Sequence, residues 1–185
     1  MSNITTLFSN KIVRITAVVT LVLLVASVLF ISRKPKSSKA QDSLLADETT
    51  QKITLDHSFQ IPLGDDSDQN ITFRLQSAEL KDSIILKGQK ARAIQGKQFL
   101  IINLKLENDQ ERRIKLDTRD YVRLTVNNSE DRLAPQIHND PVEVQPISDQ
   151  YTRVGFSISK SDTDFKLFVG PIAKDKAELP LNFNQ

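Results

Sequence analysis

An uncharged apolar run near the N-terminus constrains this chain more than any other feature of its sequence. Residues 15–31 read ITAVVTLVLLVASVLFI and contain no charged residue, proline or glycine. Extending the run back to Ile12 includes Arg14, whose long side chain can reach the lipid headgroups. The extended segment has 20 residues, and about 20 residues of α-helix cross a hydrocarbon core. The sequence therefore predicts a transmembrane helix from Ile12 to Ile31, after a short tail of residues 1–11.

Two other interpretations of this run fit less well. A cleaved signal peptide has an apolar region of about 7–15 residues, followed closely by a small-x-small site. Here the run is longer, and the residues that follow are Ser32-Arg33-Lys34-Pro35-Lys36, which are cationic. A core helix of a globular domain has a polar outer face, which this run lacks. We therefore expect an uncleaved anchor.

The flanking charges and the short tail predict opposite orientations of this anchor. Four cationic residues follow the span between Arg33 and Lys39, whereas Lys11 and Arg14 precede its apolar run. By the positive-inside rule, this excess places the C-terminal part in the cytoplasm. However, long domains are translocated largely regardless of flanking charge, and a short tail before one span is the usual form of a signal-anchor. We expect a single-pass protein of the cell membrane with its domain outside the cytoplasm.

The remaining 154 residues have room for a linker and one domain. Residues 32–50 are polar and are expected to form a flexible linker, which leaves residues 51–185 for the domain.

The composition of the chain excludes several classes of function. The chain has 25 Lys and Arg against 23 Asp and Glu, no Trp and two Tyr. Binding to nucleic acid calls for clustered cations, often interleaved with aromatic residues, so we expect none. The absence of cysteine excludes disulfides, thiolate catalysis, cysteine-based zinc sites and a lipidated cysteine.

After residue 50, apolar residues recur at every second position in short runs, which is typical of β-strands. Turn-forming pairs such as Asn127-Asn128 and Ser161-Asp162 separate these runs. Pro180 indicates that the last run is an edge strand, because proline cannot donate to a ladder. The pattern predicts an all-β domain, an antiparallel β-sandwich of seven or eight strands. The apolar runs lie within residues 53–59, 71–75, 99–107, 122–126, 154–158, 165–169 and 177–183.

Residues 96–108, GKQFLIINLKLEN, resemble the GKxFVxVxVxxxN strand of a widespread bacterial domain family of unknown function. Residues 121–124, 151–158 and 165–168 resemble later strands of the same family, so the resemblance covers about residues 53–183. It implies an immunoglobulin-like β-sandwich, similar to a secreted mycobacterial antigen and attached behind a lipoprotein signal or a membrane anchor. It brings no catalytic residues to transfer.

Catalytic motifs are missing from the sequence. No Gly-x-Ser-x-Gly, His-Glu-x-x-His or glycine-rich phosphate loop occurs, and the chain has five glycines. The two histidines are expected to be a partly buried strand residue, His57, and a solvated loop residue, His138. An enzymatic alternative needs a carboxylate pair such as Asp117 and Asp120, which nothing else in the sequence supports. We expect neither an enzyme nor a cofactor.

One acidic string suggests a metal. Asp66, Asp68 and Asn70 have the alternating oxygen ligands that open a calcium loop. Such a loop continues with glycine at its sixth position and glutamate at its twelfth, where this chain has Ile71 and Ser77. A polar hairpin tip is the favoured interpretation, and a weak calcium site is the alternative.

A second cluster suggests an interaction surface. The cationic residues Arg112, Arg113, Lys115 and Arg119 flank two apolar residues of a short strand-like stretch. A solvated strand face is the simplest interpretation, and a surface for an acidic ligand or glycan is the alternative. Together, these features predict a membrane-anchored, non-catalytic module that contacts a protein or the cell envelope. The alternative is a sensor domain for a small ligand or calcium.

Overall fold

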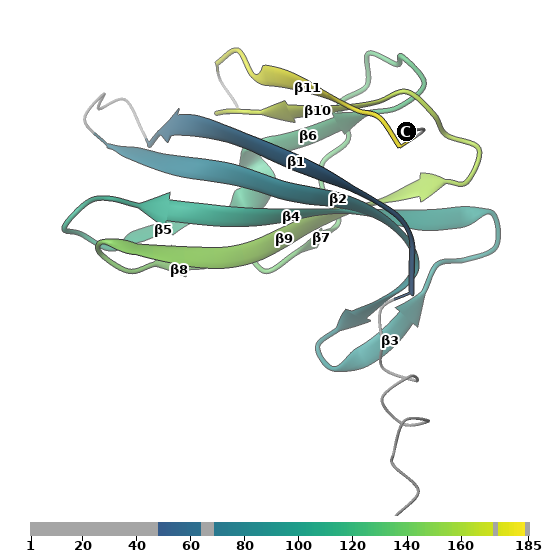
Figure 1. Cartoon of the computed structure of the whole chain (residues 1–185), viewed down its shortest axis with the longest axis horizontal. Coiled ribbons are helices and arrows are strands. Elements are labelled where there is room, and N and C mark those ends of the chain that lie inside the picture. The colour runs from purple at the N-terminus through teal and green to yellow at the C-terminus, as the bar shows by residue number, and fades with distance from the viewer. Residues whose placement is uncertain (1–47, 64–68, 172–173, 184–185) are drawn as a thin grey trace, which may run out of the picture. The chain divides into compact units, whose positions relative to one another are not determined.

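The computed structural model describes residues 48–63, 69–171 and 174–183, and these residues form an all-β domain (Figure 1). The predicted tail, transmembrane helix and most of the predicted linker lie outside the described residues. Within the described part, no helix has the length and hydropathy needed to cross a membrane. The first strand begins at Glu48, inside the range predicted as linker.

Eleven strands and one short 3₁₀ helix, η1, are found in the described residues. Seven of the strands overlap the seven apolar runs of the sequence, and the other four are two to four residues long. The elements are β1 Glu48–Pro62, β2 Asn70–Leu86, β3 Gln89–Arg92, β4 Lys97–Asn108, β5 Ile114–Leu116, η1 Thr118–Asp120, β6 Val122–Thr125, β7 Ile137–His138, β8 Val142–Val144, β9 Ser148–Ser159, β10 Phe165–Val169 and β11 Ala177–Leu181.

Two antiparallel layers enclose one hydrophobic core, as expected for a β-sandwich. The larger sheet has the order β1-β2-β4-β9-β7, and β3 also pairs with β2. The opposite layer contains the sheet β11-β10-β6 and the pair β5-β8. Figure 1 shows β6, β10 and β11 stacked over the strands of the larger sheet. Residues of both layers, such as Phe73 and Phe156 of the larger sheet and Leu167 of the smaller one, pack into one buried cluster.

The order of the strands differs from the expected immunoglobulin-like order. In an immunoglobulin domain the third strand belongs to the sheet opposite the first two. Here the three long strands β1, β2 and β4 are neighbours in one sheet. The connection between β2 and β4 explains the difference, because it is only residues 87–96 and four of them pair with β2 as β3. Both β3 and β4 pair with β2, so the chain returns to the same sheet after the hairpin.

A β-bulge at Gln76 controls which side chains of β2 enter the core. Leu75 lies opposite Leu104 of β4, but Ser77 lies opposite the adjacent Asn103, so β2 has one extra residue. Before the bulge, the odd-numbered Phe73 and Leu75 point into the core. After it, the even-numbered Ala78 and Leu80 do so. Without the extra residue, Ser77, Glu79 and Lys81 would face the core.

The outer face of the larger sheet carries a second, smaller apolar cluster. Ile84, Ile101 and Ile137 come from β2, β4 and β7, and all three are buried there. Gly155 of β9 pairs with both Ile101 and Ile137 in the ladder. A Cβ atom at Gly155 would lie 2.5 Å from the Cδ1 atom of Ile101 and 3.2 Å from Ile137. The two isoleucines therefore meet over a position that has no space for a side chain.

We predict that Gly155→Ala destabilises the domain. The added methyl group must displace Ile101 or Ile137, and such overpacking costs about 1–3 kcal/mol. Urea unfolding followed by circular dichroism measures this loss. Ser157→Ala, an exposed change two residues along the same strand, is the control and should change the free energy of unfolding by less than about 0.5 kcal/mol. Equal stability of Gly155→Ala and the wild type would contradict the close packing.

Candidate functional site

A groove opens between the edge strands of the two layers, β1 and β11. Its volume is about 710 Å³, which lies in the range of about 300–1,000 Å³ common for ligand pockets. Its apolar part comes from Leu80, Phe165, Leu181 and Phe183. The rings of Phe165 and Phe183 meet edge to face with centroids 5.9 Å apart. The polar lining is Thr50, Gln51, Gln98, Asn128, Lys160, Asp162, Thr163, Asp164, Lys166 and Asn182.

One rim of the groove is held in place by a network between two loops. Asp162 accepts a hydrogen bond from the backbone N–H of Ser159 at 2.7 Å and another from the Asn127 side chain at 2.9 Å. The Asn127 Oδ1 atom in turn accepts from the backbone N–H of Thr163 at 2.8 Å. Asn127 lies in the left-handed region with φ 54°, which asparagine tolerates better than most residues. The carboxylate of Asp162 therefore organises the rim.

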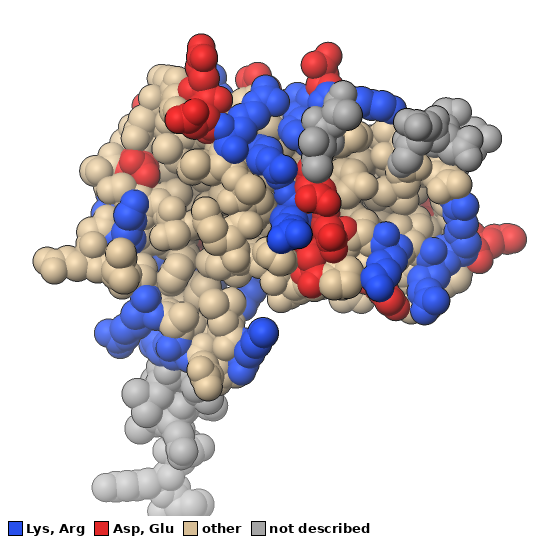
Figure 2. All heavy atoms as spheres, turned by 180° about the vertical axis from the view of Figure 1, so that it is seen from behind, with Lys and Arg blue, Asp and Glu red and all other residues tan. Residues whose placement is uncertain are grey.

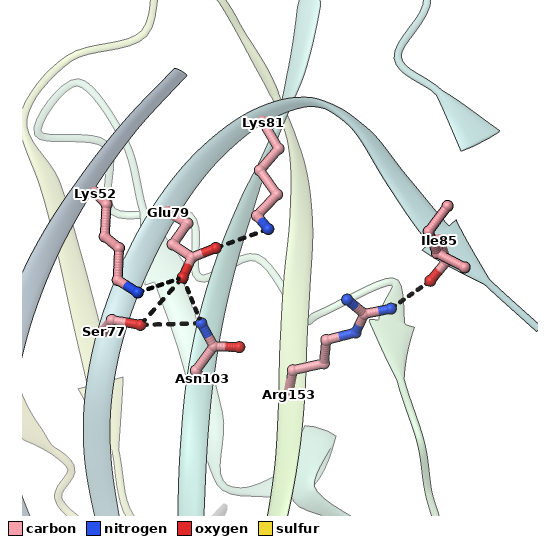
Figure 3. A network of polar contacts seen from close by, with 7 residues as sticks. All are labelled: Lys52, Ser77, Glu79, Lys81, Ile85, Asn103 and Arg153. Atoms are coloured by element: carbon pink, nitrogen blue, oxygen red, sulfur yellow. Dashed lines mark hydrogen bonds and ion pairs between the residues drawn. The ribbon is translucent and has the colours of Figure 1, made fainter. Parts of the chain in front are cut away.

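The opposite face of the groove wall carries a compact polar network (Figure 3). Glu79 contacts the ammonium group of Lys81 at 2.7 Å and that of Lys52, on β1, at 3.2 Å. Its Oε1 atom also accepts a hydrogen bond from the Asn103 Nδ2 atom at 3.0 Å. Ser77 accepts from the same Asn103 nitrogen at 2.9 Å. We call Lys52, Ser77, Glu79, Lys81 and Asn103 the Glu79 network.

The Glu79 network combines burial with charge. Glu79 and Lys81 are each 7% exposed, although they lie on the outer face of the sheet. Burial opposes ionisation of the Glu79 carboxyl, but the hydrogen bonds and charges of Lys81 and Lys52 outweigh it and hold its pKa below the ordinary value. The carboxylate is therefore ionised and binds β1 to β2. The next ladder pair, Gln51 and Leu80, lines the groove, so the network positions the groove wall.

A second ionic network lies farther along the same face. Arg74 of β2 donates two hydrogen bonds to Glu107 of β4, at 2.8 and 3.2 Å. Lys105 contacts Glu107 at 3.0 Å and Asp149 of β9 at 2.6 Å. The hydrogen bonds from Arg74 and then Lys105 lower the pKa of Glu107 to about 2. This network joins β2, β4 and β9 by charge.

The predicted interaction surface is only partly brought together. Arg113 and Lys115 both face Glu143 of β8, at 3.5 and 3.9 Å, so their charges are partly neutralised. Arg112, Arg113 and Lys115 line a hollow of about 450 Å³, together with Tyr121. Arg119 does not line this hollow and lies on η1 instead. The cluster is thus three residues rather than four.

The other predicted site residues are placed as follows. Asp66 and Asp68 lie outside the described residues, and Asn70 is the half-buried first residue of β2, so the calcium site stays a prediction. His57 is exposed rather than partly buried, although it pairs with the core residue Leu75, and it lies on the edge strand β1. His138 is half-buried rather than solvated, and its Nδ1 atom accepts a hydrogen bond from the backbone N–H of Asp140 at 3.3 Å.

Asp117 directly precedes η1 and Asp120 is its last residue, and the backbone N–H of Asp120 donates a hydrogen bond to the carbonyl of Asp117 at 3.0 Å. The single turn of η1 is held in place by another carboxylate, that of Asp140. Asp140 accepts hydrogen bonds from the backbone and hydroxyl of Thr118 at 2.7 and 2.6 Å, and from the backbone N–H of Arg119 at 3.0 Å. The carboxylates that flank η1 therefore belong to a turn whose geometry is set by structural hydrogen bonds.

Neither the groove nor the Glu79 network was anticipated from the sequence. The spacing of Glu79 and Lys81, two residues apart, was a usable signal. In a strand this spacing places both side chains on one face, where opposite charges attract. The groove has no local signature, because its lining comes from five strands, two loops and the segment that follows β11.

We predict that Glu79→Gln costs about 3 kcal/mol of stability, because it removes the carboxylate that two lysines contact while Lys81 stays buried. Combining it with Lys81→Met should restore part of the loss, since the double variant no longer buries an ammonium group. Denaturant unfolding of the single and double variants measures this coupling, with the exposed Glu178→Gln as control. A double variant that is less stable than Glu79→Gln would argue against a buried ion pair.

We predict a stability difference between pH 4.5 and 2 that depends on Glu107. Its pKa in the folded state, about 2, lies below the ordinary 4.5, so its contribution is complete above the ordinary value and is lost as the pH falls through the folded value. Glu107→Gln should therefore reduce stability by about 1 kcal/mol at pH 7 and make the acid-induced loss less steep. Thermal melting across pH 2–7 tests this, with the exposed Glu111→Gln as control. A pH profile unchanged by Glu107→Gln would refute the assignment.

Comparisons with known proteins support the β-sandwich fold of this chain. No protein-family model matches the chain, and no curated protein sequence matches it. A conserved hypothetical protein from Bacillus anthracis is 11% identical, with a TM-score of 0.50, covering 69% of this chain and 95% of its own. An uncharacterised β-sandwich protein from Clostridium difficile is 14% identical, with a TM-score of 0.49, and the match covers 74% of this chain and 98% of that protein. A functionally unknown protein from Listeria monocytogenes is 12% identical, with a TM-score of 0.49, and the match covers 77% of this chain and 92% of that protein.

Proposed function

We propose that this chain is a membrane-anchored binding module whose domain lies outside the cytoplasm and whose partner occupies the groove between β1 and β11. The observation that carries the proposal is the chemistry of the groove. It joins an apolar part, built by two phenylalanines and two leucines, to a polar rim that is already organised by hydrogen bonds. Apolar surface supplies affinity, and a small number of fixed polar groups supplies orientation.

The proposal assigns the groove to binding rather than to catalysis. Of its titratable residues, Asp162 is engaged in holding the rim, through Ser159 and Asn127. Among the described residues, no three His, Cys, Asp or Glu side chains gather into a set that could hold a metal. The charged lining is balanced, with Lys160 and Lys166 against Asp162 and Asp164, and Lys160 is paired with Asp82 at 2.7 Å. A segment of protein or of envelope polymer that carries both apolar and uncharged polar groups fits this lining best.

The anchor and the orientation rest on the sequence. The apolar segment from Ile12 to Ile31 supports a single membrane span. The motif resemblance to a bacterial family found behind a lipoprotein signal or membrane anchor supports a position outside the cytoplasm. The excess of cations after the span favours the opposite orientation, so the experiment must report on sidedness as well as on the groove.

Cysteine labelling tests both parts, because the chain contains no cysteine of its own. Asn182→Cys places a thiol in the groove, and Glu143→Cys places one on the exposed strand β8. On intact cells, a membrane-impermeant maleimide should label Glu143→Cys fully and Asn182→Cys only weakly, since a bound partner covers the groove. After purification in detergent both should react alike.

Each part of the proposal fails by a different result. Labelling of Glu143→Cys only after cell lysis would place the domain in the cytoplasm. Equally fast labelling of Asn182→Cys in cells and after purification would show that the groove is empty. The exposed Ser157→Cys on β9 serves as a second accessible control, so that slow labelling at Asn182 is not a general effect of the cell envelope.

A further inference from the structure

The hairpin formed by β2 and β3 concentrates positive charge at one end of the sandwich. Between residues 82 and 97 there are four Lys and Arg and one acidic residue, a net charge of +3. The single acid, Asp82, is paired with Lys160 at 2.7 Å. In Figure 2 the hairpin is the projection at the lower left, and only blue charged spheres are visible on it, whereas both signs mix on the rest of that face.

The same end exposes apolar side chains and a small cationic hollow. Ile94 is 74% exposed and Leu86 is 37% exposed, two of the four large apolar residues that are exposed in the described part. A hollow of about 320 Å³ lies beside Ile94, and Arg92, Lys97 and Lys160 line it together with Asp82. Apolar groups beside cations are the combination that binds the interface of an anionic membrane. We call Leu86, Lys87, Lys90, Arg92, Ile94, Lys97 and Lys160 the basic end.

The hairpin geometry holds this surface in a fixed shape. Lys87 and Gly88 form its two-residue turn, both with positive φ, 49° and 77°, as a type I′ turn requires. On one face, Ile84 packs into the outer apolar cluster and fixes the base of the hairpin. The second turn is closed by a hydrogen bond from the N–H of Lys97 to the carbonyl of Ile94 at 2.9 Å. Ile94 is therefore presented by an ordered turn.

The chain enters the domain at this end. Glu48, the first residue of β1, pairs with Ser83 at the base of the hairpin. Sixteen residues, 32–47, separate it from the predicted membrane span, and they reach at most about 55 Å when fully extended. The opposite end of the sandwich, where β4 finishes at Asn108, is farther by the length of this twelve-residue strand, about 40 Å. The chain thus enters the domain beside the basic end, and the tether is long enough to let this end reach the bilayer.

We propose that the basic end docks on the anionic lipid surface of the membrane that holds the anchor, with phosphate groups in the hollow beside Arg92 and Ile94 inserted at the acyl boundary. This inference rests on the anchor in the proposed function. Docking restrains the domain so that the larger sheet and the groove keep a fixed orientation to the bilayer. Each cation near an anionic surface strengthens such a contact about fivefold, and salt weakens it.

Fluorescence of the full chain in nanodiscs tests the docking. Ile94→Cys, labelled with an environment-sensitive fluorophore, is compared in discs of phosphatidylcholine and in discs that also contain phosphatidylglycerol. Phosphatidylglycerol should shift the emission to the blue and allow quenching by lipids with spin-labelled acyl chains. Inorganic phosphate added to phosphatidylcholine discs should have no such effect. A label at Glu143→Cys, at the other end of the sandwich, should respond in neither disc.

Charge variants give the matched comparison. Lys87→Gln with Arg92→Gln should lower the docked-to-undocked ratio about 25-fold, whereas Arg113→Gln with Lys115→Gln, an equal change of charge elsewhere, should leave it unchanged. An Ile94 label with the same emission in both discs, in a chain that co-elutes with the discs, overturns the docking and leaves the anchor intact. A chain that separates from the discs overturns the anchor and the docking together.

Discussion

At Gln76, strand β2 carries one residue more than the strand it pairs with. The residues of β2 that face the core are odd-numbered before this bulge and even-numbered after it. The neighbouring β1 is irregular at the same level, where Asp56 adopts a positive φ of 44°. Because bulges increase local twist and bend a strand, two adjacent irregularities bend the pair strongly. Figure 1 shows β1 and β2 curving together toward β3. One inserted residue thus sends Leu80 into the core and Glu79 to the opposite face.

The Glu79 network follows from this exchange of faces. Ser77, Glu79 and Lys81 would be buried in an apolar core without the bulge, at a cost of several kcal/mol for each unpaired charge. With it, they face outward, where Lys52 and Asn103 complete their contacts. The ion pair between Lys52 and Glu79 also joins the edge strand to its neighbour, one ladder position from the groove wall. The geometry of the groove is thus coupled to charge on the other side of the sheet.

The bulge also explains where sequence reasoning ended. Alternation predicts the strand through Leu75, but Ala78 and Leu80 fall on the opposite parity, so the pattern indicates a strand end where β2 continues to Leu86. Strands β3, β7 and β8 were missed because each contains at most two apolar residues, too few to establish a period. By contrast, the alternation of β4 from Leu100 to Leu106 is unbroken, so this strand could be predicted without tertiary context. All-β architecture was therefore predictable, whereas strand order and the groove depend on contacts between distant residues.

The edges that flank the groove bear on how a partner is held there. An extended peptide can bind by adding a strand to an open edge, which requires a regular row of backbone donors and acceptors. β11 lacks one donor at Pro180, and β1 is interrupted between Thr49 and Gln51 and again between Thr54 and His57. These irregularities are the devices by which native edge strands avoid pairing with other chains. The partner is thus better held by side chains, the two phenylalanine rings and the hydrogen-bonded polar groups of the rim, than by a new ladder. Recognition of this kind depends on the shape of the groove wall, and hence on the ion pair behind it.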